Sequence, residues 1–306
     1  MKHIPVMLNE VIKNFDFSSE EERNFIDATF GAGGHSIEIL KHIKKGNLFA
    51  FEKDKKSFDE ANKNTNFTQK NFFIFNKSYA LMSKYIQDFQ GKINGILFDF
   101  GVSSMQLDEV DRGFSYRYNA NLDMRFDKSQ TFSAKDVING YSLDNLIKIF
   151  FDYGEEKFSK KIAKNILKVR EIKKIETTFE LRNIIEKSIP TFDKNHTLSR
   201  IFQAIRIEVN DEFNTIKLGL NEAIKMLKPK GKIITICFHS LEDKIVKYFL
   251  KEKEKSCTCP THFPICVCNK KKEINILTKK PIFPKEEEIK INPRSRSAIM
   301  RIAEKI

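Results

Sequence analysis

Short apolar runs alternate with helical patterns at the start of the chain. The runs at residues 25–28, 48–51, 72–75 and 93–98 are too short for helices, and Ile37, Leu40 and Ile43 between them have helical spacing. Buried strands that alternate with amphipathic helices are typical of parallel sheets covered on both faces. The pattern therefore predicts an α/β fold, with a doubly wound and mostly parallel sheet.

The pattern changes after about Asp108. A polar stretch reaches about Thr131, and residues 133–209 contain only helical periodicities, with Ser133 and Thr178 suited to cap helices. The α/β pattern returns with a helix over 213–227, a strand over 232–238, a helix over 242–250 and a strand over 297–303, while residues 253–295 read as irregular. This predicts one domain from residues 1–109 and 211–306, interrupted by an all-helical domain at 110–210. An insert after the fourth strand lies at the carboxyl edge of the sheet, where such folds bind ligands.

Composition narrows the class of protein. The chain has 306 residues, of which 41% are hydrophobic and 31% charged. No uncharged apolar stretch approaches the length of about 18 residues that a membrane helix needs. The first residues contain no apolar signal core, so we expect a cytoplasmic protein whose cysteines are reduced.

The charge is strongly positive and unevenly distributed. The formal net charge is +13, and residues 244–306 alone contain 16 Lys or Arg against 7 Glu. A general bias towards Lys explains part of this excess but does not explain the clustered Arg294, Arg296 and Arg301. The C-terminal segment is therefore a candidate for binding nucleic acid.

A glycine-rich loop follows the first predicted strand, over residues 27–36, and Glu52 ends the second strand. Glycines allow a tight turn and a close approach to a ligand, and a carboxylate about 20 residues later suits ribose hydroxyls. A dinucleotide and S-adenosylmethionine both fit this arrangement. Ser36 stands where a dinucleotide motif needs its third glycine, and Asp99 adds a second acid that would repel a pyrophosphate but suits a sulfonium cation.

Further motifs, spread from residue 3 to the end, give the chain a specific resemblance. It resembles the RsmH (MraW) family of 16S ribosomal RNA cytosine-N4 methyltransferases in these segments: His3 to Leu8, Asp27 to Ser36, Asp99 to Asp108, Arg112 to Ser115, Leu122 to Arg125, Gly154 to Phe158, Arg200 to Arg206, Phe238 to Asp243 and Asn292 to Ser297. The resemblance implies a class I (Rossmann-like) methyltransferase fold with an inserted helical domain. It also implies S-adenosyl-L-methionine as donor, a decoding-centre (P-site) cytosine of the small ribosomal subunit as acceptor, and no membrane partner. A homodimer is compatible with the sequence.

The resemblance assigns the cofactor contacts position by position. They are Gly33, Gly34, His35, Glu52, Tyr79, Asp99 and Gln106. Glu52 stands where the family often has Asp, and Tyr79 where it often has Phe, so the ribose-binding carboxylate and the adenine-stacking ring are both kept.

The acceptor chemistry needs a group that holds an exocyclic amine in line with the donor methyl. Asp99 is the first candidate for this catalytic role, and Ser103 and Ser104 are the next. Related amino-methyltransferases often carry two prolines after strand four, which this chain lacks, so the acceptor group stays open at this point. Cys237 lies in an apolar strand and reads as a core residue, not as a nucleophile.

Candidate substrate contacts lie in three places. Phe100 and Phe114 are candidates to stack on a flipped base. The remaining candidates are Arg112, Asp123 and Arg125 at the start of the insert, His239 after the fifth strand, and Arg294 and Arg296 in the basic segment. For each of these, the alternative is an ordinary core, capping or surface role.

Two C-x-C pairs lie in the basic segment, Cys257 with Cys259 and Cys266 with Cys268. Four thiolates can hold zinc, but the usual pairing is C-x-x-C, and we predict no metal. The rival functions are a DNA cytosine-N4 or adenine-N6 methyltransferase, a non-catalytic RNA-binding assembly factor and, third, a dehydrogenase.

Overall fold

The computed structural model describes residues 4–17, 20–102, 106, 109–190, 194–260 and 268–306. The chain forms two compact units: a sheet unit, residues 1–101 with 213–306, and a helical unit, residues 102–212. The borders predicted from the sequence fall after residues 109 and 210, so the helical unit begins earlier and ends later than expected. The first border has a packing cause, because Phe100 belongs to the core of the sheet unit and Val102 packs on that of the helical unit.

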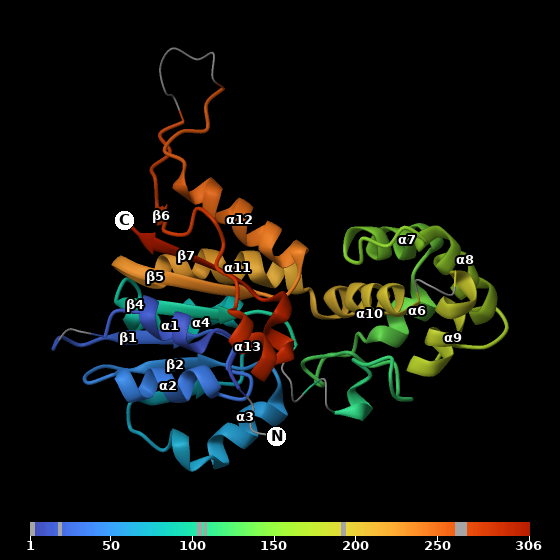
Figure 1. The fold of residues 1–306 in the computed structure, drawn as a ribbon, viewed down its shortest axis with the longest axis horizontal. Coiled ribbons are helices and arrows are strands. Elements are labelled where there is room, and N and C mark those ends of the chain that lie inside the picture. The colour runs from blue at the N-terminus through green and yellow to red at the C-terminus, as the bar shows by residue number, and fades with distance from the viewer. Residues whose placement is uncertain (1–3, 18–19, 103–105, 107–108, 191–193, 261–267) are drawn as a thin grey trace. The chain divides into compact units, whose positions relative to one another are not determined.

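The sheet unit is built on seven strands in the order β3-β2-β1-β4-β5-β7-β6 (Figure 1). Pairs among the first five strands are parallel, and β7 pairs antiparallel with both β5 and β6. The predicted mostly parallel sheet is therefore confirmed. The strands are β1 (Asn24–Asp27), β2 (Leu48–Phe51), β3 (Phe72–Phe75), β4 (Ile93–Asp99), β5 (Leu227–Cys237), β6 (Ile274–Ile276) and β7 (Ile299–Lys305).

Helices cover both faces of this sheet (Figure 1). Phe25 and Leu97 point into a core with α1 and α2, whereas their neighbours Ile26 and Phe98 point into a core with α4, α11 and α12. This alternation explains why the strands read as continuous apolar runs. The helices are α1 (Leu8–Asn14), α2 (Gly34–His42), α3 (Lys55–Lys63), α4 (Met82–Tyr85), α11 (Glu212–Met226), α12 (Ser240–Glu254) and α13 (Glu286–Ile291).

The helical unit confirms the predicted absence of regular strands, within the residues described. Its helices are α6 (Ala134–Gly140), α7 (Leu143–Asp152), α8 (Ser159–Arg170), α9 (Thr178–Ser188) and α10 (Lys194–Asn210), around one apolar core. Ser133 is the N-cap of α6, as predicted. The predicted cap of α9 was wrong by one residue: Thr177 accepts from the Glu180 N–H at 3.2 Å, and Thr178 donates to the Tyr118 carbonyl instead.

The segment expected to be irregular contains two regular elements, β6 and α13. β6 has only three residues and pairs with one neighbour at the sheet edge, which leaves little periodicity in the sequence. Short 3₁₀ turns complete the fold: Thr65–Phe67, Tyr79–Leu81, Gln87–Phe89, Val110–Arg112 and Pro293–Ser297. Among the helices of the described residues, none combines the length and hydropathy required to cross a bilayer.

Candidate active site at the carboxyl edge of the sheet

The loop after β1 turns on two glycines with left-handed backbone, Gly31 (φ 56°) and Gly33 (φ 76°). A Cβ on Gly33 would lie 2.5 Å from the Phe67 ring and 2.6 Å from the Phe30 ring. Any side chain there is therefore both strained and in collision. The turn leads directly into α2, whose first N–H groups face away from the helix and can bind a ligand.

Gly34 and His35 connect this loop to the N-terminal segment. A Cβ on Gly34 would lie 2.4 Å from the Pro5 ring, so the glycine allows Pro5 to pack here. The Nε2 of His35, whose side chain is buried, donates to the Val6 carbonyl at 2.9 Å, which leaves Nδ1 on the side of Asp99. Both residues thus have a structural role, and their contact with a cofactor stays a prediction.

Glu52 is anchored by the loop it faces. Its two oxygens accept from the N–H groups of Gly31 at 2.8 Å and of Asp54 at 2.7 Å. Each carboxylate oxygen can accept a second bond, so the group can still receive ribose hydroxyls. Burial, aided by the nearby Asp54 and Asp27 carboxylates, raises the pKa of Glu52 to about 7.

Asp27, at the end of β1, organises the loop from inside. It accepts from the Ser36 hydroxyl at 2.6 Å and from the Thr29 N–H at 3.2 Å. The Thr29 hydroxyl in turn accepts from the Asp99 N–H at 2.6 Å, which joins the loop to the end of β4. Burial raises the pKa of Asp27 to about 6.

Asp99 has an acceptor that the described protein does not satisfy. Its Oδ1 is buried and receives no hydrogen bond from the residues that the structure describes. Its Oδ2 lies 3.7 Å from Nδ1 of His35, beyond hydrogen-bond distance. Burial, with the negative charges of Asp27 and Glu242, raises the pKa of Asp99 well above its usual range. A bound cation or N–H donor would relieve both the unmet acceptor and the excess negative charge.

Glu242 is a member of this acidic cluster that the sequence did not single out. It is fully buried, and its Oε2 accepts from the Phe238 N–H at 2.7 Å. His239 is the N-cap of α12, and its Nδ1 accepts from the Glu242 N–H at 3.4 Å while its Nε2 lies 3.1 Å from Oε1 of Glu242. Glu242 lies in the first turn of α12, where acids are common, so its position in the sequence gives no sign that it is buried. Substrate contact by His239 stays a prediction.

Three aromatic rings line the same edge. Phe100 is 3% exposed and stacks on Phe98, with ring centroids 5.4 Å apart. Tyr79 is half-buried and packs edge-on against Phe98, beside Gly219 of α11. Because Phe98 and Tyr79 pack against Phe100 and leave it buried, the expectation that its ring stacks on the target base is corrected. Tyr79 keeps partial exposure, as an adenine-stacking ring requires.

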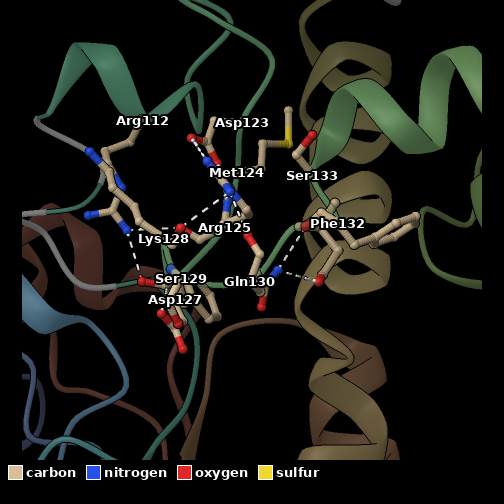
Figure 2. Close-up of polar contacts among 12 residues, drawn as sticks. Arg112, Asp123, Met124, Arg125, Asp127, Lys128, Ser129, Gln130, Phe132 and Ser133 are labelled. Carbon is tan, nitrogen blue, oxygen red and sulfur yellow. Dashed lines mark hydrogen bonds and ion pairs between the residues drawn. The ribbon is translucent and has the colours of Figure 1, made fainter.

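The predicted RNA contacts of the helical unit bind one another instead (Figure 2). Arg125 makes a two-pronged ion pair with Asp123, at 2.6 and 2.9 Å, and its third nitrogen donates to the Gln130 carbonyl at 2.6 Å. Burial alone would raise the pKa of Asp123, but hydrogen bonds and charge from Arg125 hold it below its usual value. Asp123 thus fixes the orientation of the Arg125 side chain, whose donors are engaged within the loop, and contact of either residue with substrate stays a prediction.

Arg112 is 2% exposed and donates to the carbonyls of Arg125 at 2.8 Å and of Phe126 at 3.1 Å (Figure 2). Phe114, 8% exposed, lies in the same apolar core, with the Arg112 guanidinium 5.6 Å from its ring. The burial of these two side chains argues against the expectation that Arg112 contacts substrate and that Phe114 stacks on a flipped base. A guanidinium buried against backbone carbonyls fixes the loop.

The remaining predicted residues are distributed as follows. Ser103 and Ser104 lie outside the described residues. Gln106 is buried and belongs to the helical unit. Arg294 and Arg296 are exposed in the 3₁₀ turn before β7, where they are accessible to a partner.

Comparison with known proteins gives a consistent result over the whole chain. The model of the MraW methylase family matches residues 1–306. The chain is 44% identical to "Ribosomal RNA small subunit methyltransferase H" of Finegoldia magna and 47% identical to the protein of the same name from Caldicellulosiruptor bescii. A third relative of that name, from Clostridium botulinum, is 46% identical. Each alignment covers 100% of this chain and 99% of the relative.

These matches confirm two predictions. A methylase of this family takes its methyl group from S-adenosyl-L-methionine, so the predicted cofactor is confirmed. The residues present fit this cofactor, because the unmet acceptor of Asp99 suits a cationic ligand and Glu52 can receive hydroxyls. From the full-length family match and the relatives at 44–47% identity, we conclude that this chain belongs to the MraW methylase family.

Proposed function

We propose that this protein methylates the exocyclic N4 amine of a decoding-centre (P-site) cytosine in 16S ribosomal RNA of the small subunit. The names of its relatives support small-subunit ribosomal RNA as the substrate. The observation that carries the amine as acceptor is Oδ1 of Asp99, beside the glycine loop, which is buried and receives no hydrogen bond from the described residues. A carboxylate at this position can accept a hydrogen bond from an amine and hold it for transfer.

S-Adenosyl-L-methionine supplies an activated methyl group on a sulfonium cation. A cytosine amine is a poor nucleophile because its lone pair is delocalised into the ring, so the protein must align it with that methyl. Positioning of this kind supplies a large part of the rate in such reactions. Asp99 would align the amine by accepting a hydrogen bond from one of its N–H groups, which directs the nitrogen lone pair towards the donor methyl.

The acidic cluster gives the same carboxylate a second role. The negative charges of Asp27 and Glu242 act on Asp99, and because both of these acids are buried, water screens their charges little. A positively charged ligand is stabilised in such a site relative to a neutral one. Ionised Asp99 therefore favours the charged donor over the neutral product that remains after transfer.

Methylation of the cytosine ring carbon needs different machinery. That reaction uses a cysteine thiolate to attack the ring. Cys237 is fully buried in β5, and burial, with Glu242 and Asp243 nearby, raises the pKa of its thiol well above the usual value. A thiol so placed is a poor nucleophile, which supports transfer to the amine.

RNA binding is assigned to the basic C-terminal segment together with the helical unit. Arg294 and Arg296 are exposed, whereas Arg112 and Arg125 have their donors engaged inside the loop. We therefore expect the C-terminal arginines to contact RNA phosphates. The helical unit would contribute through the shape of its surface, because the arginines of its loop bond within the loop.

The test is to incubate purified protein with labelled donor and either protein-free 16S RNA or assembled small subunits, then digest the RNA and identify the methylated nucleoside. We expect N4-methylcytidine at one decoding-centre position. Asp59→Asn, which changes an exposed acid on α3, is the control and should leave the yield unchanged. Label on the cytosine ring carbon, on adenine, or on DNA in preference to RNA would contradict the proposal.

A further inference from the structure

Three thiols from two arms of the chain gather in the basic segment after α12. Cys257 and Cys259 follow the helix, and Cys268 stands on the returning arm before β6. Their sulfur atoms all lie within 4.8 Å of one another, and Sγ of Cys257 is 3.8 Å from Sγ of Cys268. No disulfide joins the cysteines that the structure describes.

We propose that Cys257, Cys259 and Cys268 bind a zinc ion that clamps the two arms of this segment together. The first support is the spacing. With Zn–S bonds of about 2.3 Å, a tetrahedral site has sulfur atoms about 3.8 Å apart, whereas a disulfide brings them to about 2.05 Å. The 3.8 Å between Cys257 and Cys268 matches the edge of a zinc tetrahedron.

The second support is a set of backbone donors aimed at the sulfurs. The Thr258 N–H lies 3.3 Å from Sγ of Cys268, and the Cys259 N–H lies 3.3 Å from Sγ of Cys257. Donors directed at a ligand atom stabilise its charged form and fix its orientation around a metal. The C-x-C turn therefore presents two sulfurs and supplies two N–H donors in the same three residues.

The third support is a scaffold that holds the arms in place independently of any metal. The Glu273 N–H donates to the Lys253 carbonyl at 3.0 Å, and the side chains of the same two residues pair at 2.9 Å. The Ile276 N–H donates to Glu254 at 2.9 Å. In Figure 1 the two arms rise beside each other from the end of α12 and from β6. The thiols are thus brought together by the fold before a metal binds.

The surrounding charge fits a thiolate site. Three thiolates with one Zn²⁺ have a net charge of about −1. The flanking residues Lys255, Lys270, Lys271 and Lys272 are all basic and would neutralise it. Thiolate ligands select soft or borderline metals, among which zinc has no redox chemistry and accepts tetrahedral sites.

This proposal reverses the prediction of no metal made from the sequence. The C-x-C spacing differs from the common C-x-x-C pairing, and the sequence alone does not show that the two arms lie side by side. Cys266 lies outside the described residues and is not counted among the ligands. The three thiols supply three of the four ligands of a tetrahedral site, and the proposal does not depend on the identity of the methylated nucleotide.

The test uses the full-length protein without an affinity tag, purified with reductant and zinc and then dialysed against zinc-free buffer. We expect about one zinc per chain by elemental analysis. Replacement by cobalt should give the thiolate-to-metal charge-transfer absorption and the strong visible bands of a tetrahedral thiolate site. Cys257→Ser, Cys259→Ser and Cys268→Ser should each weaken zinc binding at least about tenfold.

Cys237→Ala is the matched control, because that cysteine is buried in β5 and outside the cluster. It should retain zinc, and all variants should bind S-adenosylmethionine as the wild type does if they are folded. The wild-type cobalt spectrum tests the proposal even if a variant fails to fold. Wild type without stoichiometric zinc and without the cobalt bands would overturn the proposal, as would unchanged zinc content in the three serine variants. A disulfide between these cysteines, seen under reducing conditions as a mass lower by two hydrogens, would overturn it too.

Discussion

Two parts of this protein each hold a carboxylate in a partly buried position, and the surroundings of the two carboxylates shift their pKa values in opposite directions. In the helical unit, Asp123 is paired with Arg125 through both oxygens, and its pKa lies below the usual value. In the sheet unit, Oδ1 of Asp99 has no partner among the described residues, and the pKa of this group lies well above the usual range. The charge of Asp123 is answered within the protein, whereas we propose that a bound ligand answers that of Asp99.

We propose that the difference separates residues that stabilise the fold from residues that bind ligands or take part in the reaction. A buried polar group is normally satisfied internally, and a satisfied network fixes a single conformation. A buried acid left unsatisfied beside other acids costs stability, and such groups cluster at functional sites. Asp123 and Asp99 cannot be distinguished by residue type, and only their hydrogen bonds show the difference between them.

The largest effect is expected from Arg112→Met, which tests whether the internally bonded loop of the helical unit stabilises the fold. Removing the guanidinium leaves the carbonyls of Arg125 and Phe126 without their donors inside a buried loop. We expect the free energy of unfolding to fall by about 3 kcal/mol or more, measured by urea denaturation.

The control for this variant is Arg117→Met at a neighbouring exposed position, which should change stability by less than about 0.5 kcal/mol. Normal stability of Arg112→Met together with lost RNA binding would show that this guanidinium meets RNA after all.

Glu52→Ala tests the ligand-binding side. The variant removes the carboxylate anchored by Gly31 and Asp54 that we expect to receive the ribose hydroxyls. The calorimetric free energy of S-adenosylmethionine binding should weaken by about 1–3 kcal/mol, which is a loss of affinity of roughly fivefold to 150-fold. Glu60→Ala, an exposed acid on α3, is the control and should bind normally. Equal affinities in the two variants would remove Glu52 from the site.

The pH dependence of ligand binding sharpens the comparison further. Asp27 and Glu52 titrate near pH 6 and 7 in the folded protein, above their values in an unfolded chain. The folded state therefore holds more protons than the unfolded state between about pH 4 and 7, and these groups lower stability as the pH rises. A bound cationic ligand offsets this loss of stability, because it stabilises the ionised forms of these acids.

We therefore expect the rise in melting temperature caused by S-adenosylmethionine to be larger at about pH 8 than at about pH 5.5. S-Adenosylhomocysteine, whose sulfur is uncharged, is the control and should show a weaker pH dependence. The same dependence for both compounds would argue that the cluster does not sense the sulfonium charge.

The smallest effect is expected from the double charge reversal Arg294→Glu and Arg296→Glu. These arginines, unlike Arg112 and Arg125, are exposed. The logarithm of RNA affinity should become less dependent on the logarithm of salt, by about 0.7 to 0.9 per lost phosphate contact. Lys63→Glu on α3 is the surface control. An unchanged slope in the double variant would leave the C-terminal turn without an RNA contact.

Much of the sheet unit could be predicted from the sequence, because most of its strands are short apolar runs, and three of them, β1, β2 and β4, end at or directly before an acid. Asp99, Glu52 and the glycine loop do meet at the carboxyl edge, as parallel topology requires. The burial of Arg112 and the internal hydrogen bonds of Arg125 could not be predicted in the same way. Gly113 and Met124 adopt left-handed backbone, and the Met124 N–H donates to the Arg112 carbonyl, so the loop folds back on Arg112 through contacts that leave no periodic signal. Burial of Glu242 was missed for a related reason, since a helix cap explains the same residue type.

The most direct measurement is single-turnover methyl transfer by Asp99→Asn to small-subunit RNA at saturating donor, beside a melting curve of the same preparation. Asn keeps the size of the side chain and one acceptor but removes the charge. We expect transfer to slow by about one to three orders of magnitude while the melting temperature stays within a few degrees of the wild type. Asp59→Asn should change neither quantity. Near-normal transfer by Asp99→Asn with a normal melting temperature would contradict the central claim, because the unsatisfied carboxylate would then have no part in the reaction.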